Sequence, residues 1–172
     1  MNIKGEKILL RAIEPQDNPM LLKMINDDET EYVLGGWSFP VSQKSQESWT
    51  NGLQNDKNTL RCTIDYQGNA VGVVMLTDID YKNGNAEVHI KLAVDNVRGK
   101  GNGTDALSTI VRYAFTELRL KCIYARVNRH NVISQHLFKK CGFDEEGTMR
   151  SRLYKKGEYI DVISFSIINE KD

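Results

Sequence analysis

The sequence of 172 residues lacks the features that mark several specialised classes of protein. It has only three cysteines and no C-x-x-C pair, so we expect neither a disulfide framework nor a zinc site. Its apolar runs are far shorter than the ~20 residues that span a bilayer, and its first residues form no apolar segment of signal-peptide length. We therefore predict a reduced, cytoplasmic protein with no membrane partner and no metal.

Proline is also scarce. Three prolines, 13 glycines and the absence of an internal repeat argue against a disordered or repetitive chain. The length suits one domain of ~100–200 residues, so we predict a single domain over residues 1–172. The formal net charge is zero, which argues against a general nucleic-acid binder. The two halves of the chain differ in net charge. Residues 1–86 hold 8 basic and 12 acidic side chains, whereas residues 87–172 hold 15 basic and 11 acidic ones.

Strand-like and helix-like apolar patterns follow one another along the chain. This predicts an α/β fold with a mixed central sheet and helices on its faces. The expected strands cover residues 7–13, 60–66, 70–80, 87–94, 122–127, 149–154 and 159–168. The expected helices cover residues 18–25, 42–53, 104–118 and 131–141, with an acidic stretch at 27–31 and a loop at 34–40.

The most informative segment joins the strand at 87–94 to the helix at 104–118. Gly99, Gly101 and Gly103 alternate directly before that helix, and Arg98 and Lys100 supply two positive charges. Such a loop lets backbone N–H groups converge, and the start of the helix adds partial positive charge. These residue types at this spacing predict a site for a phosphate group.

Three phosphate-loop patterns compete for this segment. The nucleotide-triphosphate loop fails, because no lysine precedes Thr104. The dinucleotide fingerprint is met only in its looser form, starting at Gly101 with Ala106 as the last small residue, and without the expected N-terminal βαβ unit. The third pattern, [QR]-x-x-G-x-[GA], is met by Arg98, Gly101 and Gly103.

With this third pattern the sequence resembles the GCN5-related N-acetyltransferases, the GNAT superfamily. The resemblance covers nearly the whole chain and is most specific at residues 94–104, 128–143 and 147–161. The last of these stretches is similar to the branch that holds the ribosomal-protein N-terminal acetyltransferases and the spermidine N-acetyltransferases. The resemblance implies the GNAT fold, in which a splayed pair of parallel strands, at 87–94 and 122–127, forms the cleft for acetyl-CoA.

The resemblance also implies which residues hold acetyl-CoA, the expected cosubstrate. The backbone of the first splayed strand would pair with the pantetheine arm, the glycine loop would hold the pyrophosphate, and the helix after the second splayed strand would meet the acetyl end. The expected cofactor-binding residues are Leu92, Ala93, Val94, Arg98, Gly99, Lys100, Gly101, Asn102, Gly103, Thr104, Asn131 and Ser134. Lys140 is a further candidate for contact with a CoA phosphate.

The chemistry of acetyl transfer sets three requirements. An amine of pKa ~10.4 must lose a proton before it attacks, the oxyanion needs a donor, and the departing thiolate needs a proton. We expect Glu87 to act as the base or to position a water, His89 to shuttle protons and Ser134 to protonate the thiolate; ordinary surface side chains are the alternative in each case. Relatives with a catalytic tyrosine carry it where this chain has Phe138, which has no proton to give.

The resemblance places the acceptor site beside the N-terminal helices. This segment contains Asp27, Asp28, Glu29 and Glu31 beside Trp37 and Phe39, and such carboxylates and aromatics would suit a cationic amine. Asp28, Glu31, Trp37 and Phe39 are the expected contacts, and a solvated acidic helix end is the alternative. The spermidine enzymes carry an acidic pair where this chain has Ser38 and Phe39, which weighs against a polyamine.

Several acceptors and one non-enzymatic function therefore stay open. A protein N-terminus and a small-molecule amine rank equally, and the small molecules include polyamines, amino sugars, aminoglycoside-like antibiotics and amino acids. A CoA-binding sensor or partner module is the alternative from another class, and a homodimer is an expectation at the level of the family. Residues 98–152 hold 11 basic and 5 acidic side chains, so we expect a basic end for the CoA phosphates and an acidic end for the amine.

Overall fold

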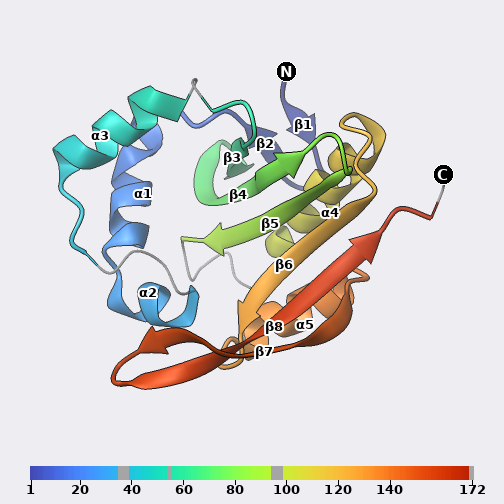
Figure 1. Ribbon diagram of the computed structural model, residues 1–172. Coiled ribbons are helices and arrows are strands. Elements are labelled where there is room, and N and C mark those ends of the chain that lie inside the picture. The colour runs from blue at the N-terminus through green and yellow to red at the C-terminus, as the bar shows by residue number, and fades with distance from the viewer. Residues whose placement is uncertain (35–38, 54–55, 94–98, 171–172) are drawn as a thin grey trace.

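The computed structural model describes residues 1–34, 39–53, 56–93 and 99–170. An eight-stranded sheet runs in the order β1-β2-β3-β4-β5-β6-β8-β7 (Figure 1). The strands are β1 Ile3–Lys4, β2 Leu9–Arg11, β3 Leu60–Tyr66, β4 Asn69–Asp80, β5 Asn85–Leu92, β6 Cys122–Asn128, β7 Asp144–Lys155 and β8 Glu158–Ile168. The helices are η1 Pro15–Asp17, α1 Asn18–Ile25, α2 Asp28–Leu34, α3 Gln43–Gly52, α4 Asn102–Thr116 and α5 Val132–Lys140. The predicted mixed α/β sheet is confirmed.

The sheet opens between β5 and β6, its one parallel pair among the described strands. Their pairing ends at Glu87 and Tyr124, after three register pairs. β5 continues beside β4 as far as Leu92, and β6 continues beside β8 as far as Asn128. Because each strand keeps its antiparallel neighbour, the two diverge and leave a wedge, as Figure 1 shows. The splayed pair expected from the sequence is therefore present.

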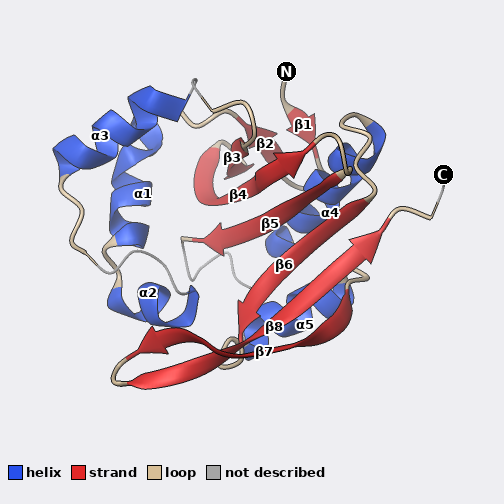
Figure 2. Cartoon of the chain, in the orientation of Figure 1, coloured by secondary structure: helices blue, strands red, loops and turns tan. Residues whose placement is uncertain are grey.

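The two faces of the sheet carry different helices. On β4, Val74 points into the main core with Leu107 of α4, whereas its neighbour Val73 packs with Leu21 and Met24 of α1. Because successive side chains of a strand point to opposite faces, α1 and α4 lie on opposite sides. Figure 2 shows α4 and α5 behind the central strands, with α1 to α3 at their open end. The wedge is thus bordered by α4 and α5 on one side and by the N-terminal helices on the other.

Helix α2 differs most from the sequence expectation, which left an acidic stretch and a loop in this region. The side chain of Asp27 accepts a hydrogen bond from the N–H of Thr30 at 2.7 Å and so caps the new helix. Acidic side chains at Asp28, Glu29 and Glu31 fill its first turn, where they complement the helix dipole. None of its residues is buried, so its sequence has no apolar stripe from which a helix could be predicted. Residues 35–38 of the expected loop lie outside the described residues.

Other elements differ at their ends. Strand β7 begins at Asp144, five residues before the expected start, and α4 begins at Asn102 rather than at Thr104. Among the described helices, none combines the length and the apolar character needed to cross a membrane.

Candidate active site

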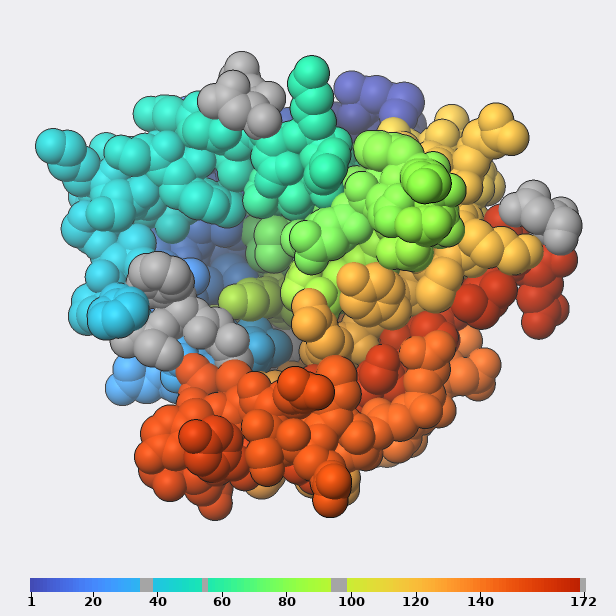
Figure 3. Space-filling view, in the orientation of Figure 1, coloured from blue at the N-terminus to red at the C-terminus, as the bar shows by residue number. Residues whose placement is uncertain are grey.

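A cleft of about 740 Å³ lies between the N-terminal helices and the start of α4. Its volume is within the ~300–1,000 Å³ typical of sites for small molecules and cofactors. Figure 3 shows the surface hollowed between the N-terminal helices and strands β5 and β6. The predicted cofactor-binding residues that line it are Leu92, Ala93, Gly99, Gly101, Asn102, Gly103, Thr104, Asn131 and Ser134. Lys140 also lines it, Lys100 is exposed outside its lining, and Val94 and Arg98 lie outside the described residues.

The glycine loop takes the conformation that an anion site needs. Gly99 and Gly101 have φ angles of 77° and 85°, which only glycine adopts readily. Gly101 caps α4, and its carbonyl accepts the first helical hydrogen bond, from the N–H of Asp105 at 2.9 Å. The N–H groups of residues 102–104 therefore have no hydrogen-bond acceptor within the helix. They point toward the cleft end of the helix, where its dipole favours a phosphate.

A lysine outside the motif borders this loop. The carboxylate of Asp105 accepts the backbone N–H groups of Glu6, Lys7 and Ile8 at 2.9, 2.6 and 3.1 Å. Burial alone would raise the pKa of Asp105, but these three donors hold it below its ordinary value. The ammonium of Lys7 then donates to the carbonyl of Lys100 at 3.2 Å. Sequence analysis missed Lys7, because more than 90 residues separate it from the loop.

The backbone of β5 is shared between β4 and the wedge. Ala93 donates its N–H to the carbonyl of Val71 at 2.8 Å, so β4 already uses this group. Because hydrogen-bonding groups alternate between the two sides of a strand, the N–H and C=O groups of Ile90 and Leu92 point toward the wedge. Leu92 thus fits the expected pairing with an extended ligand, whereas the N–H of Ala93 does not. Val94 cannot be placed, since it lies outside the described residues.

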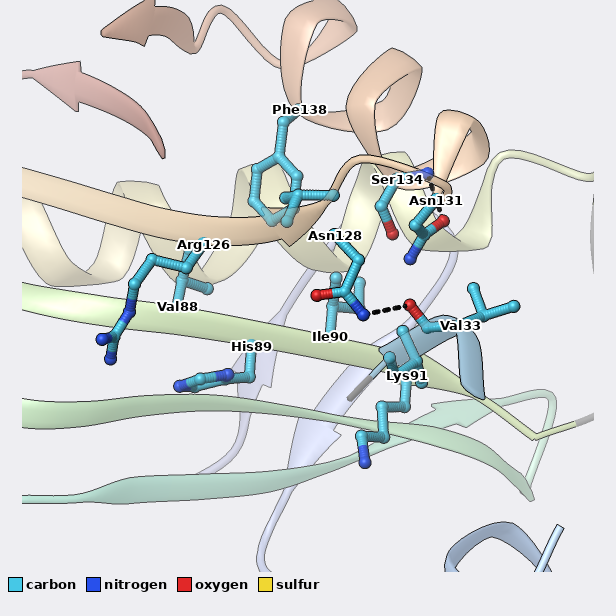
Figure 4. A pocket seen from close by; sticks show the side chains of 12 residues that line it. Val33, Val88, His89, Ile90, Lys91, Arg126, Asn128, Asn131, Ser134 and Phe138 are labelled. Carbon is cyan, nitrogen blue, oxygen red and sulfur yellow. Dashed lines mark hydrogen bonds between the residues drawn. The ribbon is translucent and has the colours of Figure 1, made fainter. Parts of the chain in front are cut away.

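A smaller pocket of about 60 Å³ lies in the wedge itself (Figure 4). We call it the wedge pocket. It is lined by twelve residues from β5, β6, α5 and α2: Val33, Leu34, Val88, His89, Ile90, Lys91, Arg126, Val127, Asn128, Asn131, Ser134 and Phe138. Six of them, among them Lys91, Asn131 and Ser134, also line the large cleft. The two spaces therefore meet at the end of β5.

Polar side chains from β6 and α5 fix the far wall of the wedge pocket. Asn131 caps α5, because its side-chain oxygen accepts the N–H of Ser134 at 3.0 Å. The amide of Asn128 donates to the carbonyl of Val33 at 2.9 Å and so ties β6 to α2, as the dashed line in Figure 4 shows. Among the described residues the hydroxyl of Ser134 has no hydrogen-bond partner, so it is available to a ligand.

Phe138 forms the apolar part of that wall. It is 3% exposed, lies edge-on to Phe143 at 5.0 Å between ring centroids, and stacks near Phe165 at 6.1 Å. These contacts hold its ring rigidly in a core position. Phe138 therefore gives the pocket an apolar wall without a proton donor, whereas the hydroxyl of Ser134 lies one helical turn earlier on the same wall.

Glu87 does not lie where the sequence predicted a base. Its side chain is 2% exposed and lines neither the cleft nor the wedge pocket. Arg126 binds the carboxylate through two hydrogen bonds, one from Nε at 2.9 Å and one from Nη2. This pairing holds the carboxylate of Glu87 away from the lining of both spaces, and its catalytic role stays a prediction. The sequence could not show this pair, because its members are 39 residues apart on different strands.

His89 does line the wedge pocket. Its Nε2 lies 3.0 Å from Thr77 Oγ1 and 3.8 Å from the Glu87 carboxylate. Burial lowers the pKa of His89; Glu87 opposes this shift, whereas the charges of Arg126 and Lys91 add to it. The imidazole is therefore neutral near pH 7 and can accept a proton.

Lys91 was not singled out by the sequence analysis. It lies at the junction of the cleft and the wedge pocket and is half-buried. Burial lowers its pKa as well. Its only signal in the sequence was its place on the same strand face as Glu87 and His89.

The structure places the members of the expected acceptor wall in different surroundings. Asp28 is exposed and lines neither space, and Phe39 is 68% exposed and lines neither space. Glu31 instead forms an ion pair with Lys155 of β7, and Trp37 lies outside the described residues.

Two acidic residues of the expected wall do line the cleft. Asp27 and Glu29 border it together with Lys23 and Thr30. Residues 28–34 form a helix, and Asp28 and Glu31 lie on another face of it. The carboxylates that border the cleft are therefore those of Asp27 and Glu29.

The described part of the chain contains no group of three or more His, Cys, Asp or Glu side chains that could hold a metal ion.

Comparison with known proteins agrees with this geometry. The family model of the acetyltransferase (GNAT) domain matches residues 7–144. The uncharacterized N-acetyltransferase YokL, derived from the SPbeta prophage of Bacillus subtilis, is 30% identical over 168 residues, which is 97% of this chain and 93% of that protein. The spermidine N(1)-acetyltransferase of Vibrio cholerae is 27% identical over 170 residues, 97% of this chain and 96% of that protein.

A solved structure is similar over its whole length. The crystal structure of spermidine N-acetyltransferase from Vibrio cholerae, in complex with CoA and spermine, matches with a TM-score of 0.89 at 28% identity, covering 97% of this chain and 98% of that one. The family match spans well over half of the sequence, and the splayed sheet and glycine loop agree with it. The chain thus belongs to the GNAT acetyltransferase family and is an N-acetyltransferase that takes its acetyl group from acetyl-CoA.

Proposed function

We propose that this enzyme transfers the acetyl group directly to a primary amine that enters the wedge from the side of α1 and α2. The observation that carries the proposal is the junction of the two spaces. The large cleft ends at the glycine loop, which suits phosphates, and its other end shares Lys91, Asn131 and Ser134 with the wedge pocket. Donor and acceptor can therefore meet there in one ternary complex.

The residues of the cleft fit acetyl-CoA. The N–H groups of residues 102–104 and the positive end of α4 suit its pyrophosphate, and Lys7 and Lys140 lie close enough to add charge. The backbone of Leu92 is free on the wedge side to pair with an extended arm. Acetyl-CoA supplies the thioester carbonyl that an amine can attack.

Residues of the wedge pocket supply the proton transfers. His89 is neutral near pH 7, so it takes the proton that the amine loses, and Glu87 acts as a positioning residue 3.8 Å behind it. The hydroxyl of Ser134 donates a proton as the thiolate departs. Asn131 holds the first turn of α5, and with it Ser134, in place. Phe138 keeps water away from the thioester.

A panel of amines tests this function. Release of the CoA thiol is followed with polyamines, aminoglycosides, nucleotide amino sugars, amino acids and short peptides, and mass spectrometry identifies each acetylated product. We expect acceptor-dependent release with at least one class. Tight binding of acetyl-CoA without release for any amine would overturn the proposal in favour of a CoA-binding sensor or partner module.

A polyamine is the second candidate acceptor. The relatives named spermidine acetyltransferases point to it, and the cleft-lining carboxylates of Asp27 and Glu29 would attract a cation. Spermidine and spermine therefore belong in the panel. The homodimer expected from the family also stays a prediction, and light scattering of the purified chain tests it.

A further inference from the structure

The charge of the wedge pocket contrasts with that of the N-terminal helices. Three of the twelve residues that line it carry basic side chains: His89, Lys91 and Arg126. No carboxylate is among these lining residues. In the proposed function the acetyl group is transferred at this point. These bases therefore lie close to the part of the acceptor that is attached to its amine.

Only one of the three bases brings an uncompensated charge. Arg126 is paired with Glu87 through two hydrogen bonds, and burial keeps His89 neutral near pH 7. The ammonium group of Lys91 forms no ion pair and no hydrogen bond with any residue that the structure describes. Leaving an ammonium half-buried without a partner is unfavourable, and a ligand anion would relieve that cost.

The position of Lys91 assigns it to the acceptor. Its register partner on β4 is Val73, whose side chain packs against α1. Cross-strand partners point to the same face, so Lys91 also faces the side of α1 and α2. The groups that would bind the donor, the backbone of Ile90 and Leu92, lie in the plane of the sheet. Lys91 is therefore next to the donor in sequence but turned toward the acceptor.

We infer that the acceptor is a small primary amine that carries an anionic group, and that Lys91 binds this group. The inference rests on the proposed function and names its substrate class. A carboxylate or a phosphate would each satisfy Lys91, whereas a polyamine would bring further positive charge to a pocket without acids. The acceptor is small, because the pocket is narrow and α2 is tied across it by the Asn128 bond to Val33 and the Glu31 pair with Lys155.

Matched pairs of acceptors test the inference. Each pair has one amine and differs only in the anion: β-alanine against β-alaninamide for the carboxylate, and glucosamine 6-phosphate against glucosamine for the phosphate, with spermidine as the cationic comparison. We expect kcat/KM to favour the anionic member of at least one pair by about 10- to 100-fold, as for a hydrogen bond to a charged group. The pair that shows the preference identifies the anion.

Variants then assign the preference to Lys91. Lys91→Met keeps the apolar stem and should remove most of the preference through a higher KM for the acceptor, with KM for acetyl-CoA changed less than about twofold. Lys91→Arg, which keeps the positive charge, should retain part of the preference for anionic acceptors. Lys44→Met, an exposed lysine on α3, is the matched control, and equal melting temperatures show that each variant is folded.

The outcomes separate the two levels of the proposal. If neutral or cationic amines are acetylated as well as anionic ones, or if Lys91→Met leaves the preference intact, the inference is wrong and the proposed function stands. If no amine of any charge is acetylated while acetyl-CoA binds, both are wrong.

Discussion

The pairing of buried Glu87 with half-exposed Arg126 predicts that the loss of each partner affects stability differently. Arg126→Met leaves a carboxylate that is 2% exposed without its guanidinium partner. Removing one member of a buried pair typically costs about 3–5 kcal/mol. Glu87→Gln instead leaves an arginine that is 52% exposed and can return to water. We expect that change to cost only about 1–2 kcal/mol, near the value of the lost charge-assisted hydrogen bonds.

These costs convert to melting temperatures that are easy to separate. At about 2–4 °C per kcal/mol for a chain of this size, Arg126→Met should lower Tm by roughly 6–20 °C and Glu87→Gln by roughly 2–8 °C. Circular dichroism during heating or urea unfolding measures both. The double variant should lose less than the sum of the single losses, because the two residues interact directly.

Activity separates a positioning role for Glu87 from a direct one. If Glu87 acts through His89, Glu87→Gln should lower kcat less than about tenfold and keep the acid limb of the pH profile, whereas loss of a direct base costs about 10²–10⁴. The reasoning is refuted if Glu87→Gln destabilises the protein more than Arg126→Met does, or if it abolishes the acid limb.

Four further changes test other parts of the site. His89→Gln should remove the acid limb of kcat/KM; in the unmodified enzyme activity should fall only below the ordinary histidine pKa of about 6.5, because burial lowers the pKa of His89. Lys7→Met should raise KM for acetyl-CoA about three- to tenfold at unchanged kcat, and an unchanged KM would exclude Lys7 from the phosphate site. Gly101→Glu should abolish acetyl-CoA binding in calorimetry, since it places a carboxylate in a left-handed position at the start of α4. The pKa of Asp105 is lowered in the folded chain, so its contribution is full above the unfolded pKa of about 3.9 and is lost as pH falls through the lower folded value. Unfolding at pH 3 to 7 should therefore show a smaller acid loss for Asp105→Asn than for the unmodified chain.

Local patterns in the sequence predicted the strand, the glycine loop and the helix of the cofactor side. Val88, Ile90 and Leu92 alternate along β5, and the structure buries them or packs them against the core. The glycine spacing predicted a loop before the helix, although α4, which Gly101 caps, begins two residues before the expected start. Both features are set by neighbours within a few residues, which is why a single sequence reveals them.

The acceptor side depends on contacts between distant segments. Whether Glu87 reaches a ligand is decided by Arg126 on another strand, and whether Glu31 does so is decided by Lys155 on β7. Helix α2 is held by its Asp27 cap and by Asn128 rather than by an apolar stripe. No local pattern encodes such pairings, so the sequence did not show which of the acidic residues at 27–31 border the cleft.

Strand β5 explains how one segment can serve two substrates. Past Glu87 it loses its parallel neighbour, so the backbone of Ile90 and Leu92 is left facing the wedge, where an extended donor can pair with it. The alternate residues, His89 and Lys91, direct their side chains to the face of α1, where we propose that the acceptor enters. A shift of one residue in the β4–β5 register would exchange these two sets. Pairing with β4 along the whole length of the wedge, as far as Gly72 and Leu92, is therefore what keeps donor recognition in the backbone and acceptor recognition in the side chains.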